Sequence, residues 1–227
     1  MEFMIKSYLM SPKKLKAIIY DFDGTIANTE IIHFNAWQNT LIDFGYKLTD
    51  LPPTIRLNMM GKKPLTIAVE IVDFLKLKVS PNDLLNKKTE YFLGSVFVTV
   101  KLNAGIEDVL KYQRDKGYKI AIGSSGERDY INKILNKFNL SNYFDTIVSG
   151  EKIKKGKPDP ETYITVLKKL HLSPSECIII EDAKNGIEAG KKAGCFCIAL
   201  LTPNTDMNDL KDADAIISSL NEINTFC

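Results

Sequence analysis

Six short apolar runs, rich in β-branched residues, recur along the chain, and most of them end in a polar or small residue. They span residues 15–20, 118–122, 146–148, 177–180, 195–201 and 215–217. Short unbroken runs of this kind are typical of strands that are buried on both faces, as in a parallel sheet. Ligands of such sheets bind beyond the carboxyl ends of the strands, so the polar residues that follow the runs are expected to meet along one edge.

Between these runs, apolar residues recur at helical spacing. They predict helices over residues 106–116, 129–138, 160–170 and 186–193. Gly117 and Gly194 follow two of these segments, where glycine favours the end of a helix. Alternation of strands and helices predicts an α/β fold with a doubly wound, Rossmann-like parallel sheet.

One spacing along the chain is too long for a simple strand–helix–strand unit. Asp21 and Ser124, which follow the first two runs, lie 103 positions apart, whereas such a unit takes about 30 residues. The intervening segment carries helical patterns broken by prolines. We therefore expect residues 29–97 to form a small helical cap domain over the sheet edge, and residues 1–28 and 98–227 to form the core domain. Extra helices packed on the sheet are the alternative.

Composition and charge narrow the class of protein. The chain has 227 residues, is 44% hydrophobic and 26% charged, and carries a net charge of +2, which is typical of a globular domain. Only three of its 30 cationic residues are arginines, so nothing indicates a nucleic-acid partner or an anionic membrane surface. No stretch approaches the roughly 20 apolar residues of a membrane span.

The termini and cysteines favour a cytoplasmic protein. Residues 1–16 contain no continuous apolar core of a signal peptide, and we expect a flexible lead-in there. The four cysteines form no C-x-x-C pair, and three of them lie within apolar runs. Buried, reduced thiols in a reducing compartment are the expected outcome.

Two carboxylates follow the first apolar run. Asp21 and Asp23 stand at alternate positions of an extended segment, so they share one face. Two acids this close are unfavourable unless a cation or a proton lies between them. Mg²⁺ would suit the pair, and a carboxylate can also attack a phosphoryl group. A calcium-loop fragment or an ordinary turn is the alternative, although the rest of the calcium-loop pattern is missing.

Other polar groups follow later runs in the same way. Ser124 and Ser125 lie in a Gly-Ser turn that could cradle a phosphate. Lys157 lies in a loop before a helix, where its charge could neutralise phosphate, and Glu181 and Asp182 could bind metal. Alone, each has an ordinary alternative: a capped turn, a solvated lysine, an acidic helix cap. Together they are the groups that phosphoryl transfer needs.

The chain resembles a known family, the haloacid dehalogenase superfamily, and within it the branch of beta-phosphoglucomutase and sugar-phosphate phosphatases. The likeness covers about residues 15–220. It rests on four motifs in family order, which are DFDGT at 21–25, IAIGSS at 120–125, GKPDP at 156–160 and EDAKNGI at 181–187. The segment at 28–37 is similar to the entry into the helical cap of that branch.

The resemblance implies roles for the matching residues. Asp21 would be the nucleophile that forms an aspartyl-phosphate and a Mg²⁺ ligand, and Asp23 the general acid/base with its backbone carbonyl on the metal. Ser124, Ser125 and Lys157 would hold the phosphoryl oxygens. Asp182 would complete the metal site, and Glu181 would either contact the metal or support one of its ligands. We expect a neighbouring carboxylate to raise the pKa of Asp23, and Asp21 to lie on a solvated rim.

The cap differs from the mutase pattern. In the mutase an arginine follows the cap glycine by three residues, whereas here Gly61 is followed by Lys62, Lys63 and a proline. Loss of that arginine argues against a bisphosphate intermediate. Substrate contacts are expected among Lys62, Lys63 and Lys87. His33 matches a histidine of the mutase cap linker, with a packing role as the alternative.

The function expected from these residues is Mg²⁺-dependent hydrolysis of a small phosphomonoester, with a sugar phosphate favoured. The partner would be a small phosphorylated metabolite, and the chain a monomer or weak homo-oligomer. Alternatives are a phosphotransferase of the beta-phosphoglucomutase kind and a phosphonate hydrolase, which would need a cap lysine that forms a Schiff base. A signalling receiver and a catalytically silent binding protein belong to other classes. Receivers are about 120 residues long and lack a cap insertion.

Overall fold

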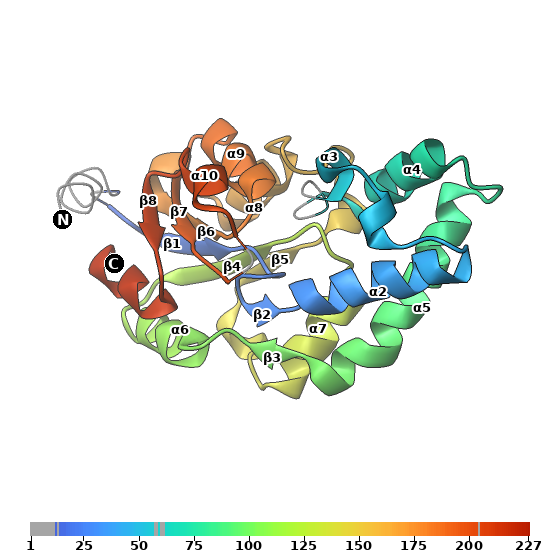
Figure 1. The fold of residues 1–227 in the computed structure, drawn as a ribbon. Helices are drawn as coiled ribbons and strands as arrows, with labels where there is room; N and C mark the ends of the chain where they lie inside the picture. The colour runs from blue at the N-terminus through green and yellow to red at the C-terminus, as the bar shows by residue number, and fades with distance from the viewer. Residues whose placement is uncertain (1–11, 13, 57–58, 60–61, 204) are drawn as a thin grey trace.

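The fold of the chain is given by a computed structural model, which describes residues 12, 14–56, 59, 62–203 and 205–227 (Figure 1). Most of the expected lead-in and Gly61 therefore lie outside the described residues. The strands are β1 (Ala17–Tyr20), β2 (Ala27–Asn28), β3 (Lys101–Leu102), β4 (Lys119–Gly123), β5 (Thr146–Val148), β6 (Cys177–Glu181), β7 (Phe196–Leu200) and β8 (Ala215–Ile217). The helices are α2 (Glu30–Asp43), α3 (Pro53–Arg56), α4 (Pro64–Leu75), α5 (Pro81–Thr99), α6 (Ile106–Asp115), α7 (Arg128–Lys137), α8 (Glu161–Leu170), α9 (Lys184–Lys192) and α10 (Met207–Leu210).

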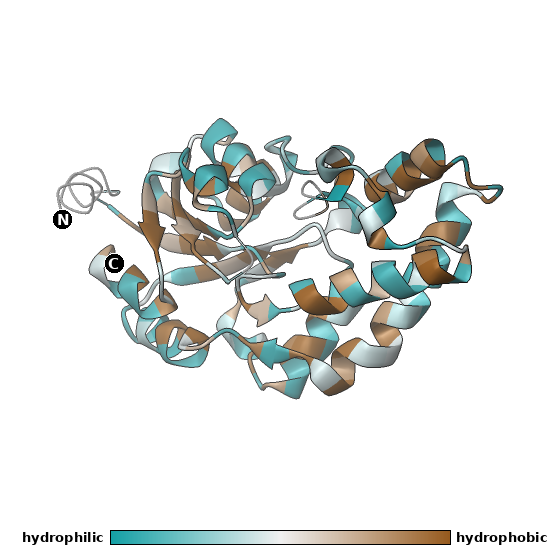
Figure 2. Ribbon diagram, viewed as in Figure 1, coloured by the Kyte–Doolittle hydropathy of each residue, from teal (hydrophilic) through white to brown (hydrophobic). Residues whose placement is uncertain are grey.

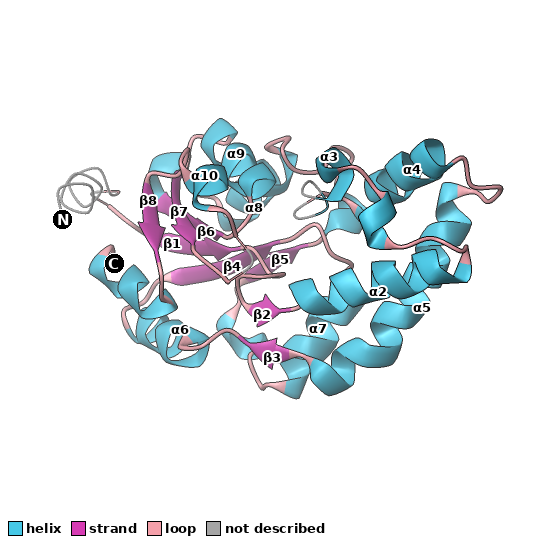
Figure 3. Ribbon diagram, viewed as in Figure 1, coloured by secondary structure: helices cyan, strands magenta, loops and turns pink. Residues whose placement is uncertain are grey.

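All six apolar runs form strands of one parallel sheet, in the order β5-β4-β1-β6-β7-β8. Helices α6 and α7 cover one face of the sheet and α8 and α9 the other (Figures 1 and 3). Much of the six-stranded sheet is coloured brown, the colour of hydrophobic residues, in Figure 2. This arrangement confirms the doubly wound α/β fold, because strands covered by helices on both faces bury both sets of side chains.

The helices between β2 and β3 form the cap, which here means α2, α3, α4 and α5. The cap has an apolar cluster of its own, built around Trp37, Leu41, Ile71 and Leu84. In Figure 1 its helices lie to one side of the sheet. Its last helix ends at Thr99, beyond the expected boundary at residue 97. The short antiparallel pair β2–β3, which the sequence pattern did not predict, joins the two connections between cap and core.

The register of the sheet sets the position of the site. Tyr20 at the end of β1 is level with Ile122 in β4 and Ile180 in β6. The residues that follow these three neighbouring strands therefore leave the sheet at the same height, and they include Asp21, Ser124 and Asp182.

Two other expectations concern cysteines and membranes. Cys177, Cys195 and Cys197 are free thiols buried in the core, as expected. Among the described residues, no helix has both the length and the apolar character needed to cross a membrane.

Candidate active site

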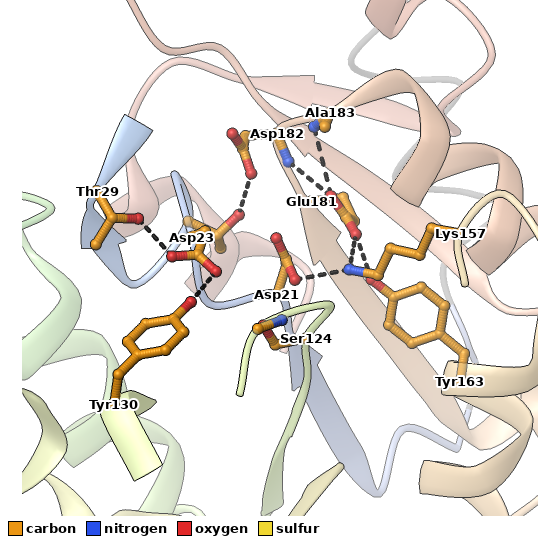
Figure 4. A network of polar contacts seen from close by, with 12 residues as sticks. Asp21, Asp23, Thr29, Ser124, Tyr130, Lys157, Tyr163, Glu181, Asp182 and Ala183 are labelled. Carbon is orange, nitrogen blue, oxygen red and sulfur yellow. Dashed lines mark hydrogen bonds and ion pairs between the residues drawn. The ribbon is translucent and has the colours of Figure 1, made fainter. Parts of the chain in front are cut away.

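Asp21 begins the site directly after β1, at the carboxyl edge of the sheet (Figure 4). Its backbone N–H donates to the carbonyl of Ile180, which continues the ladder between β1 and β6. The residue is only 5% exposed. The expected position on a solvated rim was therefore wrong, because the surrounding loops and the cap cover this edge of the sheet.

Lys157 joins two of the acids. Its Nζ lies 2.6 Å from Oδ1 of Asp21 and 2.6 Å from Oε1 of Glu181, and all three side chains are buried. Burial by itself lowers the pKa of the Lys157 ammonium, but the charges of Asp21 and Glu181 raise it more, so the net shift is upward. The hydroxyl of Tyr163 donates to the same Glu181 oxygen. Lys157 therefore stays charged and holds Asp21 at a fixed place.

Three carboxylates could hold a metal ion. One oxygen each from Asp21, Glu181 and Asp182 lies within 4.8 Å of the others. Lys157 is the ammonium that contacts this group, so the buried cluster has an excess of two negative charges when all four groups are ionised. Hard oxygen ligands with excess negative charge fit Mg²⁺. The residues therefore suit the ion that the sequence indicated.

The neighbouring loop holds Asp182 in place. The hydroxyl of Thr25 donates to Oδ1 of Asp182 over 2.8 Å, and both side chains are buried. Gly24 has a φ of +81°, and a Cβ there would lie 2.0 Å from Oδ2 of Asp182. Glycine is therefore needed both for the backbone conformation and for the close approach of this carboxylate.

The acids of this cluster carry raised pKa values. Burial, followed by the charges of Glu181 and Asp23, raises the pKa of Asp21 to about 8, although Lys157 opposes the shift. Burial and then Glu30 raise the pKa of Asp182 well above its usual range. A divalent cation would stabilise the ionised forms and reverse both shifts.

Asp23 faces away from this cluster, toward the cap. Its Oδ1 accepts a 2.5 Å hydrogen bond from the Thr29 hydroxyl and lies 3.4 Å from Nε2 of His33, and its Oδ2 accepts from the hydroxyl of Tyr130. Burial raises the pKa of Asp23, but these groups outweigh burial and lower it. The expected raised pKa was therefore wrong, because donors surround the carboxylate.

A buried lysine from the cap supports His33. Nζ of Lys88 lies 2.7 Å from Nδ1 of His33 and 4.5 Å from the centre of the Phe92 ring, which stacks on the imidazole. Burial lowers the pKa of Lys88 to about 8, and burial together with Lys88 lowers the pKa of His33. A neutral imidazole that accepts at Nδ1 carries its proton on Nε2, which faces Asp23.

Ser124 and Ser125 lie between β4 and α7. Ser124 is buried beside Asp21 in Figure 4, and its hydroxyl oxygen accepts from the backbone N–H of Gly126 over 2.9 Å. Ser125 lines the cavity described next. Hydroxyls and backbone N–H groups at the start of a helix suit a phosphoryl group.

A cavity of about 470 Å³ lies between core and cap over these residues. Asp21, Asp23 and Asp182 line its core side, and His33, Lys62 and Lys88 line its cap side with several apolar side chains. Lys62 also forms a 2.7 Å ion pair with Glu70. The structure thus brings His33 and Lys62, but neither Lys63 nor Lys87, to the cavity wall.

The other two cap lysines make different contacts. Lys63 donates to the backbone carbonyls of Ile153 and Lys154 in the core. Lys87 forms a 3.3 Å ion pair with Asp43 and lines another groove of the cap. That these two lysines contact the substrate stays a prediction; in this structure Lys63 joins cap to core, and Lys87 joins α5 to α2.

Sequence reasoning missed five side chains of the site. Thr25 ends the first motif and Thr29 follows it by four residues, and a hydroxyl close to two acids was a weak signal. The other three are Lys88, Tyr130 and Tyr163. They lie on helices whose sequence pattern distinguishes only a buried apolar face from an exposed polar face. They are brought to the site by packing, and no local signal distinguished them from other residues of their type.

The chain is similar in sequence to a known family and to several characterised proteins. The sequence model of the haloacid dehalogenase-like hydrolases matches residues 18–200. The phosphorylated carbohydrates phosphatase of Thermotoga maritima is 29% identical over 79% of this chain and 82% of its own length. The beta-phosphoglucomutase of Bacillus subtilis is 31% identical over 82% of this chain and 83% of its own length.

A solved structure shows the same fold. The crystal structure of beta-phosphoglucomutase from Clostridium difficile superposes with a TM-score of 0.81 at 24% identity, and the match covers 93% of this chain and 97% of that chain. The match of the family model over most of the chain, including all four motifs, shows that this protein belongs to the haloacid dehalogenase-like hydrolases.

Proposed function

We propose that the protein is a Mg²⁺-dependent phosphatase of small phosphomonoesters, with sugar phosphates as the favoured class, and that it works through an aspartyl-phosphate on Asp21. The observation that carries the proposal is the contact between Lys157 and Asp21 beside two further buried carboxylates. This arrangement combines a positioned nucleophile with the cationic groups that a transferring phosphoryl needs. The names of related phosphatases support the substrate class.

The first step is attack on phosphorus. An oxygen of Asp21 forms a bond to phosphorus while the bond to the ester oxygen breaks, and the leaving alkoxide takes a proton from the carboxyl group of Asp23. This step needs Asp23 protonated, so the charge of the bound phosphate has to raise the pKa that His33, Thr29 and Tyr130 lower in the free site. Lys157 and the groups around Ser124 bind the phosphoryl oxygens. Mg²⁺ held by Asp21, Asp182 and the Asp23 backbone, with Glu181 beside or behind them, would offset the negative charge of the phosphate.

The second step releases phosphate. The Asp23 carboxylate accepts a proton from water as the water oxygen attacks phosphorus, and the bond between phosphorus and Asp21 breaks. Hydrogen bonds from Thr29 and Tyr130 favour the ionised form of Asp23, which is the form that this step requires. The cap closes the cavity to bulk water, which protects the acyl phosphate.

A mutase activity would need a second phosphate site on the cap side of the cavity. A bisphosphate intermediate would place a second phosphate near the cap. Lys62 there is already paired with Glu70, and the carboxylate of Glu127 also lines the cavity. Arg56 also lines the cavity, although it does not stand at the position where the mutase pattern has its arginine. Isomerisation of glucose 1-phosphate therefore has to be measured beside phosphate release.

A phosphonate hydrolase is the second candidate, and one observation favours it. Lys88 is a buried cap lysine in the cavity with a pKa lowered to about 8, which makes its amine more reactive toward a carbonyl. Borohydride added with phosphonoacetaldehyde tests this candidate. Covalent labelling of Lys88 with loss of activity would establish a Schiff base, and its absence would remove the candidate.

The main test measures phosphate release from a panel of sugar, polyol and nucleotide phosphates with Mg²⁺, alongside isomerisation of glucose 1-phosphate. We expect phosphate release, abolished by EDTA and by Asp21→Asn. Mass spectrometry of acid-quenched wild type should place one phosphoryl group on Asp21. Isomerisation that outpaces release by orders of magnitude would overturn the phosphatase assignment, and so would full activity of Asp21→Asn.

A further inference from the structure

Tyr130 contacts the core and the cap at the same point. It lies on α7 and is 7% exposed, and its hydroxyl donates to Oδ2 of Asp23. Its ring meets the Phe92 ring edge-on, with centroids 5.3 Å apart at 81°, and the His33 ring at 6.4 Å and 78°. Phe92 and His33 belong to cap helices α5 and α2, whereas Tyr130 and Asp23 belong to the core.

We propose that Tyr130 is a positioning residue that couples the orientation of the Asp23 carboxyl group to the closed position of the cap. This inference rests on the proposed phosphatase function, in which Asp23 donates a proton to the leaving group. The stacked rings of Phe92 and His33 lie against Tyr130 while the cap is closed. The Tyr130 hydroxyl is then held on Asp23.

The turn that carries Ser124 leaves room for this hydroxyl. A Cβ on Gly126 would lie 2.2 Å from the Tyr130 hydroxyl oxygen, so a larger residue at position 126 would displace it. The same glycine donates its N–H to the Ser124 hydroxyl oxygen. The glycine therefore serves two purposes: it shapes the turn around Ser124 and admits the tyrosine.

The two oxygens of Asp23 are held separately. Thr29, from the connection into the cap, donates to Oδ1, and Tyr130 donates to Oδ2. Loss of the Tyr130 hydroxyl leaves Oδ2 without this donor. The carboxyl group, which Thr29 still holds at Oδ1, can then rotate about its Cβ–Cγ bond. A misdirected carboxyl group slows transfer of the proton to the leaving oxygen.

This role has a kinetic signature that depends on the leaving group. An alkoxide leaving group needs the proton as the P–O bond breaks, whereas p-nitrophenolate leaves readily without it. The effect of Tyr130 should therefore be large for glycerol 3-phosphate and small for p-nitrophenyl phosphate. A purely structural role for Tyr130 would affect both substrates equally.

The experiment compares kcat/KM of wild type and Tyr130→Phe on these two substrates with saturating Mg²⁺, because kcat/KM covers phosphoryl transfer to Asp21 and leaves out the water step that both substrates share. We expect kcat/KM to fall about tenfold or more for glycerol 3-phosphate and less than twofold for p-nitrophenyl phosphate. Tyr20→Phe is the matched control, because it also removes a buried tyrosine hydroxyl, which donates to Gln113 over 2.8 Å. It should lower thermal stability without altering the ratio of the two rates.

A second variant tests the cap contact. Phe92→Leu removes the ring that meets Tyr130 edge-on but leaves both hydrogen-bonding groups of the Tyr130–Asp23 pair. The rate with glycerol 3-phosphate divided by the rate with p-nitrophenyl phosphate should again fall. An equal fall on both substrates in Tyr130→Phe would overturn the proposal, and an unchanged ratio in Phe92→Leu would refute the coupling to the cap. If wild type hydrolyses neither ester, the proposed function itself fails, and this inference fails with it.

Discussion

Nζ of Lys157 lies 2.6 Å from Oδ1 of Asp21, although 136 positions separate the two residues in the sequence. The same ammonium is 2.6 Å from Glu181, at the end of β6. Because β1 and β6 are neighbours in the sheet, the two acids reach one cation from adjacent strands. The contact leaves the cluster with more carboxylates than cations.

Replacement of Lys157 by methionine should lower kcat about 10²–10³-fold, since one fixed group that stabilises the transition-state charge is lost. The variant should also unfold at lower temperature, because Asp21 and Glu181 would remain buried without their cation. Phosphate release and circular dichroism measure the two effects.

Lys155→Met is the matched control for this variant. Lys155 lies two residues away in the same loop and is exposed, so both activity and melting temperature should stay near the wild-type values. Activity of Lys157→Met within threefold of wild type would contradict the assigned role of the ammonium.

The stability of the metal-free protein should fall as the pH rises. The Asp21 carboxyl has a pKa of about 8 in the folded chain because of its burial and its acidic neighbours, against about 3.9 in the unfolded chain. Between these values the folded state binds more protons, so its stabilising contribution is complete below about pH 4 and is lost as the pH rises to about 8. Asp21 alone contributes at most about 1.4 kcal/mol per pH unit to the slope of the unfolding free energy.

Urea unfolding in EDTA between pH 5 and pH 8 measures this slope. Asp21→Asn cannot ionise at this position and should show a shallower slope, with greater stability than wild type at pH 8. Added Mg²⁺ should stabilise wild type most at the high end of the range. Equal slopes for wild type and Asp21→Asn in EDTA would refute the raised pKa of this carboxyl.

Thr25→Val should weaken metal binding rather than the chemical step. The Thr25 hydroxyl orients Asp182 over 2.8 Å, and loss of such a supporting hydrogen bond typically costs about 10–100-fold in metal affinity. The Mg²⁺ concentration for half-maximal activity should rise by this factor, while the rate at saturating Mg²⁺ changes little.

Thr40→Val serves as its control, because Thr40 is also a buried threonine, whose hydroxyl donates to the carbonyl of Ala36 within the cap. Its Mg²⁺ requirement should equal that of wild type. If Thr25→Val behaves the same way, Asp182 is not part of the metal site as we assign it.

Lys63→Met should favour an open cap. Lys63 donates to the carbonyls of Ile153 and Lys154, and its side chain covers Gly156, where a Cβ would lie 2.6 Å from the Lys63 Cγ. Hydrogen bonds to a charged group contribute about 1.5–3 kcal/mol, so KM should rise about tenfold or more while the fold persists.

Small-angle scattering without substrate should show a larger radius of gyration for Lys63→Met. Lys78→Met, at an exposed cap position, is the control and should change neither quantity. An unchanged KM in Lys63→Met would show that this contact does not hold the cap.

The strands and the sheet could be predicted because their causes are local. Each apolar run is long enough to show that both faces are buried, and all six runs form strands. The pair β2–β3 could not be predicted, since two residues in each strand are too few for any periodicity. The end of the last cap helix at Thr99, beyond residue 97, had no local signal either, because neither glycine nor proline follows it directly.

The chemistry of the site divides in the same way. The sequence alone determined which groups the site contains and that they follow successive strands. Because strand ends in a parallel sheet converge, this was enough to predict that the groups meet. The tertiary structure decided how each group is surrounded. The sequence predicts a raised pKa for Asp23, whereas in the fold His33, Thr29 and Tyr130, from separate elements, surround its carboxylate and lower the pKa.

The cap lysines show the physical reason for this division. Lys62 and Lys63 are adjacent in the chain and chemically identical, yet one lines the cavity and the other binds core carbonyls. A residue's type and order are written in the sequence, whereas the direction of its side chain and the charges around it depend on which distant segments pack beside it. Those contacts arise only when the chain is folded.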